Sequence, residues 1–151
     1  MRDFDRDGTL DLFIANKTSN DVSYLAGVGD GTFLGRVDYP LDPDPYSVAV
    51  EDFNGDGILD VAVAVWSTEV VQVLFGNGDG SFTYADLISV GSMPHFVATG
   101  DFNGDGMPDL VVANSGSNTI SLMLNNTQPH RWLCARPRFC NPSQDLSTPS
   151  P

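Results

Sequence analysis

The fold of this chain is decided by one stretch, Asp52-Phe53-Asn54-Gly55-Asp56-Gly57-Ile58-Leu59-Asp60. Side chains that carry oxygen stand at its first, third, fifth and ninth positions, and a glycine stands at its sixth. Alternate Asp and Asn residues let a tight loop place several hard oxygen atoms around one cation, and the glycine permits the sharp turn that brings the last carboxylate round. The apolar run Val61-Ala62-Val63-Ala64-Val65 follows directly. The stretch therefore predicts a metal-binding loop that leads into a buried strand.

The same loop occurs twice more in the chain. Its other copies are Asp3-Phe4-Asp5-Arg6-Asp7-Gly8-Thr9-Leu10-Asp11 and Asp101-Phe102-Asn103-Gly104-Asp105-Gly106-Met107-Pro108-Asp109. The copies start at residues 3, 52 and 101, so the intervals 52 − 3 and 101 − 52 both equal 49 residues. A fixed period of this length indicates a repeat protein in which every unit carries one loop.

The charge of the chain is concentrated in these loops. Twenty acidic residues against seven basic ones give a net charge of −13 over 151 residues, and half of the acids lie in the three loops. Carboxylates gathered in this way repel one another unless a cation lies between them. A chain this acidic is expected to bind neither nucleic acid nor an anionic membrane surface. No apolar run is long enough for membrane insertion.

The units between the loops are expected to consist of short strands and tight turns, since no helical periodicity is present. In the complete second unit, Gly76-Asn77-Gly78-Asp79-Gly80 predicts a hairpin turn. The proline-rich segment 40–45 cannot lie within a sheet and is expected to cross between units. Strands are predicted at 10–15, 22–26 and 32–39 in the first unit, at 47–51, 59–65, 70–75 and 81–89 in the second, and at 96–100, 110–113 and 119–124 in the third.

These units favour a β-propeller. A strand that is apolar on both faces, such as 61–65, belongs in a sheet stacked between neighbouring sheets. A parallel β-helix is the main alternative, but its repeats are shorter and lack hairpin turns. We therefore expect an all-β fold, a partial β-propeller of about two and a half four-stranded antiparallel blades with cation-binding inter-strand loops. The predicted units are 1–45, 46–93 and the incomplete 94–128, followed by an irregular, disordered tail at 129–151.

The loop, the apolar strand after it and the turn Gly-Asn-Gly-Asp-Gly-Ser-Phe together resemble the FG-GAP/VCBS repeat. That repeat builds the β-propeller of integrin α-subunits and of many secreted proteins, and the resemblance covers roughly residues 2–125. In the family, the loop joins the first two strands of a blade and binds Ca²⁺. The resemblance implies up to three Ca²⁺ sites, with these side-chain ligands and seventh-position backbone carbonyls: Asp3, Asp5, Asp7, Asp11 and Thr9; Asp52, Asn54, Asp56, Asp60 and Ile58; Asp101, Asn103, Asp105, Asp109 and Met107.

The first site departs from the family pattern. It has Arg6 where the other loops have Gly55 and Gly104, and it lacks the strand that leads into the loop. Its four carboxylates favour tighter binding, whereas the positive charge of Arg6 and the ordering of a free terminus, at about 1–2 kcal/mol per residue, oppose it. We expect the first site to be the weakest.

The loops admit two other interpretations. An EF-hand requires an acid at position twelve between two helices, but the twelfth residues here are Ile14, Val63 and Val112, inside predicted strands. The EF-hand is therefore rejected. An Asp- and Gly-rich turn that holds no ion is the remaining alternative.

The expected function is a non-enzymatic, Ca²⁺-stabilised module for adhesion or for recognition of a protein or glycan. The alternatives are a lectin that uses Trp66 or Tyr46 and a non-catalytic accessory domain of a secreted polysaccharide-degrading enzyme. The chain has only two histidines, His95 and His130, and one lysine, Lys17, and shows no nucleophile paired with a base. The resemblance implies an extracellular or cell-surface location, although no signal peptide precedes the first loop.

Two pairs of residues admit more than one interpretation. His95 follows Pro94 as Tyr46 follows Pro45, and these positions either contact a partner or vary as ordinary surface. Cys134 and Cys140 either close a small disulfide loop in the tail or remain unpaired. Propellers have about 4–8 blades, so we expect that the chain self-associates or that further blades complete the ring.

Overall fold

The computed structural model describes residues 1–126 and 131–134, which form β-strands and no helix. Within that part of the chain, no helix could cross a membrane. The strands make three antiparallel sheets. The first contains β1 (Leu12–Asn16), β2 (Asp21–Leu25) and β3 (Val37–Pro40), in that order. The second contains β4 (Pro45–Glu51), β5 (Asp60–Val65), β6 (Val70–Gly76) and β7 (Phe82–Ser89). The third contains β8 (Pro94–Gly100), β9 (Asp109–Asn114), β10 (Thr119–Asn126) and β11 (Arg131–Cys134).

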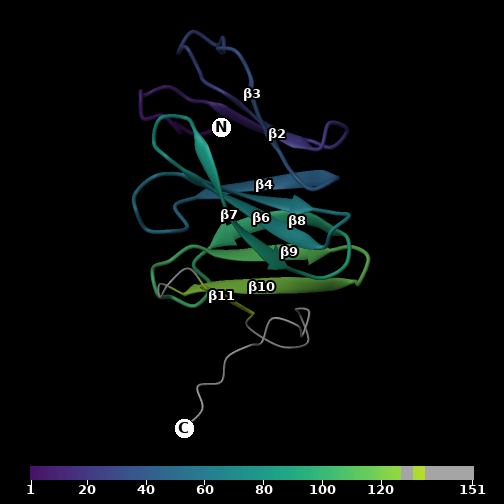
Figure 1. The fold of residues 1–151 in the computed structure, drawn as a ribbon. Helices are drawn as coiled ribbons and strands as arrows, with labels where there is room; N and C mark the ends of the chain where they lie inside the picture. The colour runs from purple at the N-terminus through teal and green to yellow at the C-terminus, as the bar shows by residue number, and fades with distance from the viewer. Residues whose placement is uncertain (127–130, 135–151) are drawn as a thin grey trace.

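The three sheets are stacked in the order of the chain (Figure 1). Every sheet is built from consecutive strands that pair with their neighbours, as blades of a propeller do. The loops predicted to bind metal join β4 to β5 and β8 to β9 and precede β1, so they lie at one end of the strands. The predicted fold class, an all-β arrangement of partial propeller blades, is confirmed.

Two expected segments differ from the structure. The strand predicted at 32–39 contributes a single bridge, from Phe33 to Gly27, and regular pairing begins only at Val37. Gly35 lies between these two parts and has no side chain to pack in a ladder. The irregular tail predicted from residue 129 instead contains β11, which pairs with β10 and completes a fourth strand of the third blade.

Strand β11 forms because an aromatic side chain anchors it. The Trp132 ring lies 5.7 Å from the Phe53 ring, centroid to centroid, in an edge-on arrangement. This contact joins the third blade to the loop at residues 52–60. Cys140 and the rest of the expected tail lie outside the described residues, so the pairing of the cysteines stays a prediction.

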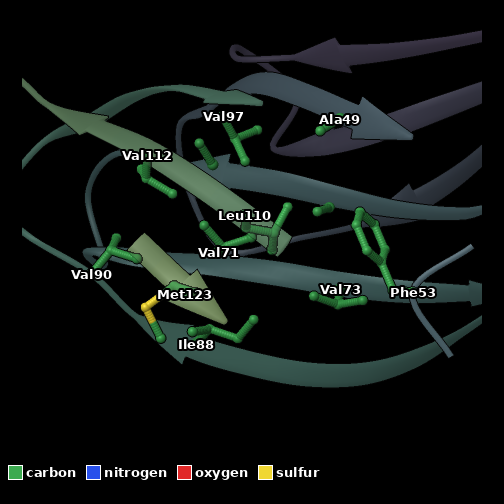
Figure 2. Packing of buried hydrophobic residues seen from close by; sticks show 12 residues of the cluster. Ala49, Phe53, Val71, Val73, Ile88, Val90, Val97, Leu110, Val112 and Met123 are labelled. Carbon is green, nitrogen blue, oxygen red and sulfur yellow. The ribbon is translucent and has the colours of Figure 1, made fainter. Parts of the chain in front are cut away.

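The second blade supplies both halves of the core. Every residue of β5 is buried, as the apolar pattern of 61–65 predicts. Ala62 and Ala64 face a cluster shared with the third blade, which includes Leu110 and Val112 (Figure 2). Val61 and Val63 face the opposite cluster, which is shared with the first blade. The alternation of side chains along one strand thus holds three sheets together.

The second residue of the loop connects one blade to the next. Phe4 and Phe53 are each only 2% exposed, whereas Phe102, in the last loop, is 51% exposed. Phe4 contacts Phe82 of the second blade at 5.6 Å between ring centroids, and Phe53 contacts Trp132 of the third blade. The loop phenyl group is therefore buried between its own blade, where Phe4 contacts Phe13 and Tyr24, and the blade that follows it in the chain.

This arrangement predicts different effects for the same substitution in two loops. Phe53→Ala should lower the free energy of unfolding by about 3–5 kcal/mol, because it opens a cavity at the interface between two blades. Phe102→Ala, the matched control, should change it by less than about 0.5 kcal/mol, because that ring is half exposed. Urea unfolding followed by fluorescence measures both. Equal losses in the two variants would contradict the proposed direction of packing.

Candidate metal centre

The three loops share one hydrogen-bond pattern. The carboxylate of the first residue accepts from the backbone amide of the sixth: Asp52 from Gly57 at 2.7 Å and Asp101 from Gly106 at 3.0 Å. The fifth residue accepts from the amide of the seventh, as Asp56 does from Ile58 at 2.7 Å. These bonds turn the backbone amides toward the carboxylates and fix the loop around a central space. The corresponding bonds in the first loop are Gly8 to Asp3 and Thr9 to Asp7.

The fourth position of every loop is left-handed. Gly55 and Gly104 have φ of 77° and 79°, and Arg6 has φ of 63° at the same place. A side chain in this conformation costs about 1–2 kcal/mol. Arg6 offsets part of that cost, since its guanidinium donates to the backbone carbonyl of Gly57 in the second loop. The arginine therefore joins two loops.

The ninth residue of the loop is a buried carboxylate that joins the loop to a hairpin. Asp11, Asp60 and Asp109 are each 0% exposed. One oxygen of Asp60 accepts from the amide of Phe53 at 2.9 Å, and the other accepts from the amide of Gly76 at 2.9 Å. Asp11 bonds in the same way to Phe4 and Gly27, and Asp109 bonds to Phe102 and Asn125.

A glycine makes this contact possible on the hairpin side. A Cβ atom at Gly76 would lie 2.3 Å from the backbone carbonyl oxygen of Leu59, and one at Gly27 would lie equally close to that of Leu10. The third blade has Asn125 at this place, and its side-chain amide donates to the carbonyl of Phe53 at 2.6 Å. The third hairpin is thus bonded to the second loop as well as to its own.

The buried carboxylates carry an electrostatic cost in the absence of a cation. The pKa of Asp60 is raised to about 6: burial is the main cause, the amides of Gly76 and Phe53 oppose it, and the neighbouring Asp56 and Asp52 carboxylates add to it. The exposed Asp101 has a pKa below its usual range because the amides of Gly106 and Gly104 donate to it. A positive ion near Asp60 would favour its charged form.

The first loop brings the most carboxylate oxygens together. One oxygen from each of Asp3, Asp5 and Asp11 lies within 4.8 Å of the other two. The Oδ1 atom of Asp3 is buried and has no hydrogen-bond partner. A buried carboxylate oxygen without a donor is costly unless a cation occupies its free side. This oxygen therefore fits a site for a positive ion.

A tyrosine that the sequence did not indicate also belongs to the first site. The Tyr24 hydroxyl lies 3.2 Å from Asp11 Oδ2 and 3.3 Å from Asp5 Oδ2. Burial, followed by these two carboxylates, raises the pKa of Tyr24 above its usual range, so the hydroxyl remains a donor. Tyr24 comes from β2, and no motif in the loop signals its presence.

Among the described residues, the structure brings the predicted carboxylate ligands together in the first loop only, and in the second and third loops the predicted side-chain ligands bond to one another. In the second loop, Asn54 Oδ1 accepts from the amide of Asp56 and its Nδ2 donates to Asp56 Oδ2, both at 2.9 Å, and Asn103 and Asp105 repeat this pair in the third loop. The predicted donor set consists of carboxylate, amide and backbone oxygens, which suit Ca²⁺ and not a soft metal. The predicted roles of the Thr9, Ile58 and Met107 carbonyls stay predictions.

The hydrogen bonds of the buried Asp60 carboxylate predict that its removal lowers stability even without metal. In the presence of EDTA, Asp60→Ala should lower the free energy of unfolding by about 3–5 kcal/mol, because the amides of Phe53 and Gly76 lose their acceptor. Asp79→Ala removes an exposed carboxylate that accepts from Ser81 in a turn, and should cost less than about 1 kcal/mol. Urea unfolding of both variants measures the difference. If Asp60→Ala lowered the free energy of unfolding as little as the control does, this structural role of Asp60 would be refuted.

A comparison with known families matches this repeat. The model of the FG-GAP-like repeat matches the chain twice, over residues 3–63 and 52–112. The matches start at the first and second loops, and together they span more than half of the chain. No curated protein and no solved structure matches it. With its three loops in phase and its stacked antiparallel blades, the chain belongs to the FG-GAP-like repeat family and is a propeller-type repeat module.

Proposed function

We propose that this chain is a Ca²⁺-stabilised recognition module in which the ions hold the blades in shape and the opposite end binds a protein or glycan partner. The observation that carries the calcium proposal is the partnerless buried Oδ1 atom of Asp3, beside Asp5 and Asp11. FG-GAP-like repeats are generally binding modules without catalytic activity, and we propose the same for this chain.

Calcium would act here as a structural ion. The loop residues that would hold it include the ninth aspartate, which also bonds to the hairpin of the same blade. An ion at this place would offset the repulsion among the carboxylates and stabilise the burial of Asp11, Asp60 and Asp109. The ion would then stabilise the contact between loop and hairpin, in which backbone amides of both segments donate to the ninth aspartate.

The proposed affinity favours an extracellular setting. Extracellular Ca²⁺ modules have Kd values of about 10⁻⁴–10⁻³ M. At about 1 mM Ca²⁺, a site with such an affinity adds about 0.4–1.4 kcal/mol to the free energy of unfolding. The same site is nearly empty at the sub-micromolar Ca²⁺ of a cytosol. We therefore propose that the module works outside the cell or at its surface.

Calcium binding is tested by calorimetry on the full chain. Up to three sites should titrate, and each of Asp3→Asn, Asp52→Asn and Asp101→Asn should remove one. The first site should be the weakest, because Arg6 is held in a left-handed conformation at the fourth position of its loop. Addition of 1 mM Ca²⁺ should raise the melting temperature, and 1 mM Mg²⁺ should raise it less. No heat and no shift in melting would refute the calcium proposal.

The end opposite the loops carries a cluster that spans all three blades. We define the aromatic end cluster as Lys17, Tyr46, Trp66 and His95, which lie where β1 and β5 end and where β4 and β8 begin. The Tyr46 ring lies 4.5 Å from the His95 ring and 6.3 Å from the Trp66 ring, centroid to centroid. Lys17 Nζ lies 4.4 Å from the Tyr46 ring centroid and donates to its hydroxyl.

This cluster supports partner recognition at the end away from the metal loops. Aromatic rings, a cation and an imidazole together offer stacking and hydrogen bonding, which protein and glycan ligands both use. No single strand supplies these groups, since Lys17 comes from the first blade, Tyr46 and Trp66 from the second and His95 from the third. The geometry of the blades would therefore control the geometry of the binding surface.

A lectin is the second candidate, and the same cluster favours it. In a glycan array, a lectin should lose binding at least about tenfold on Trp66→Ala or Tyr46→Ala, since stacking on a ring is lost. Asp79→Asn, on an exposed turn at the loop end, is the matched control and should retain binding. If no glycan binds while a protein partner does, and the same two variants abolish that binding, the protein-recognition form of the proposal holds. If binding survives both substitutions, the aromatic end cluster is excluded as the binding site.

A further inference from the structure

The space between the second and third loops differs from the space between the first and second. Arg6, at the fourth position of the first loop, donates to the carbonyl of Gly57, at the sixth position of the second. A Cβ atom at Gly57 would lie 3.8 Å from the Arg6 guanidinium. In the next pair of loops these positions are Gly55 and Gly106, and no atom of the described residues lies within 4 Å of a Cβ atom at Gly106. The place that a guanidinium fills beside the second loop is therefore open beside the third.

A cavity of about 400 Å³ occupies this open place. Its volume is within the range of about 300–1,000 Å³ that is common for ligand sites. Gly55 and Gly106 both line it, together with the acidic residues Glu51, Asp52 and Asp101, and none of its lining residues is basic. A hollow lined by charges of one sign concentrates the field and attracts a ligand of the opposite sign. The cavity is therefore suited to a cationic group.

One acid of this cavity has no role in the proposed calcium sites. Glu51 is half-buried and directly precedes the second loop, where the first loop has Arg2 and the third has Gly100. Neither of the two ion pairs in the described part of the chain involves Glu51. Its carboxylate is therefore available to a cation that enters the cavity.

A hydroxyl group in the cavity wall also lacks a partner. The Oγ1 atom of Thr99 is buried and makes no hydrogen bond within the described residues. The residue one repeat earlier is Val50, which has the same shape without the hydroxyl. A buried hydroxyl without a partner costs free energy, and a change of χ1 rotamer would turn this oxygen toward the cavity. Packing of the blade does not require the hydroxyl, but a donor in the cavity would satisfy it.

We infer that the cavity between the second and third loops binds the arginine side chain of a partner polypeptide. Its guanidinium would lie where that of Arg6 lies one repeat earlier, and would donate to the Gly106 carbonyl, the Glu51 carboxylate and the Thr99 hydroxyl. A guanidinium presents several N–H donors in one plane and can bond to a carbonyl and a carboxylate at once, whereas an ammonium is a compact charge. The precedent within the chain is an arginine on a polypeptide loop, which favours a side chain over a free small molecule. The site lies at the loop end and does not depend on the aromatic end cluster.

The test uses a capped arginine, N-acetyl-arginine methylamide, titrated into the isotope-labelled full chain at constant ionic strength. It should shift the backbone amide NMR signals of Gly55, Thr99 and Gly106 in a saturable way. Capped citrulline has the same shape without the charge and should bind at least about tenfold more weakly. Absence of saturable shifts, or equal binding by citrulline, would overturn the inference.

Two further probes identify the group that binds. Capped lysine should bind at least about threefold more weakly than capped arginine, because an ammonium cannot bridge the acceptors in one plane. The free guanidinium ion should also bind at least about threefold more weakly, because it lacks the alkyl chain that would contact the cavity wall. Equal binding by lysine would overturn the assignment to a guanidinium, and equal binding by the free ion would overturn the assignment to a side chain.

A substitution that fills the cavity locates the site. Gly55 has φ of 77°, close to the 63° of Arg6, and a Cβ atom there would lie 3.7 Å from Met107 Cε, an ordinary contact. Gly55→Arg should therefore supply its own guanidinium, as Arg6 does, and weaken binding of capped arginine at least about tenfold. Gly104→Arg is the matched control: it adds the same charge at the same loop position, with φ of 79°, and does not line the cavity. If Gly55→Arg bound the probe as the control does, the inference would fail.

Two isosteric substitutions test the proposed acceptors without filling the cavity. Glu51→Gln should weaken binding at least about fivefold, since a charged hydrogen bond is lost, and Thr99→Val about threefold. Unchanged binding in both variants would overturn the inference.

Titration with EDTA and again with excess Ca²⁺ separates this site from the proposed calcium sites. Glu51, Thr99 and the Gly106 carbonyl are not among the proposed calcium ligands, so binding of capped arginine should persist with Ca²⁺. If Ca²⁺ abolished it, the probe would occupy a calcium loop and the inference would fail while the calcium proposal stood. Binding of the probe by a chain that takes up no Ca²⁺ would support the inference and refute the calcium proposal.

Discussion

The structure depends on one buried carboxylate in each repeat. Asp60 uses both of its oxygens to accept backbone amides, one from its own loop and one from the hairpin after β6. A carboxylate removed from water must be fully bonded, since a charged hydrogen bond contributes about 1.5–3 kcal/mol and an unpaired buried charge costs more. The rest of the loop is arranged around this requirement: a glycine brings the hairpin backbone close, and the other acids lie on the solvent side. The proposed metal site and the fold therefore share a residue.

The sequence predicts the local features well because they depend on local chemistry. The spacing of Asp, Asn and Gly defines the loops, and the apolar run 61–65 identifies a strand covered on both faces, as the structure confirms. The features that it does not predict depend on contacts between units. Strand β11 forms because Trp132 meets Phe53 of the preceding unit. Tyr24 contacts the first loop from a different strand, and the repeat pattern of the sequence does not predict this contact.

The first loop shows how a departure from the repeat is accommodated. Arginine is a poor residue for a left-handed position, and next to four carboxylates it would be expected to turn toward them. The Arg6 guanidinium instead donates to the Gly57 carbonyl, so a residue that weakens its own turn stabilises the approach of two blades. Asn125 makes a similar link from the third hairpin to the second loop. The residues that break the repeat pattern are thus those that join neighbouring repeats.

The one-way burial of the loop phenyl group has a consequence for synthesis on the ribosome. Since the chain grows from its amino end, each loop emerges before the blade that covers its phenylalanine. Phe4 contacts Phe13 and Tyr24 of its own blade, but its contact with Phe82 forms only when the second blade has been made, and the contact of Phe53 with Trp132 forms only when β11 has been made. A nascent array of these repeats therefore presents one incompletely buried loop phenylalanine near its growing end. Chaperones that bind exposed aromatic groups would meet the array at a site that moves forward by one repeat at a time.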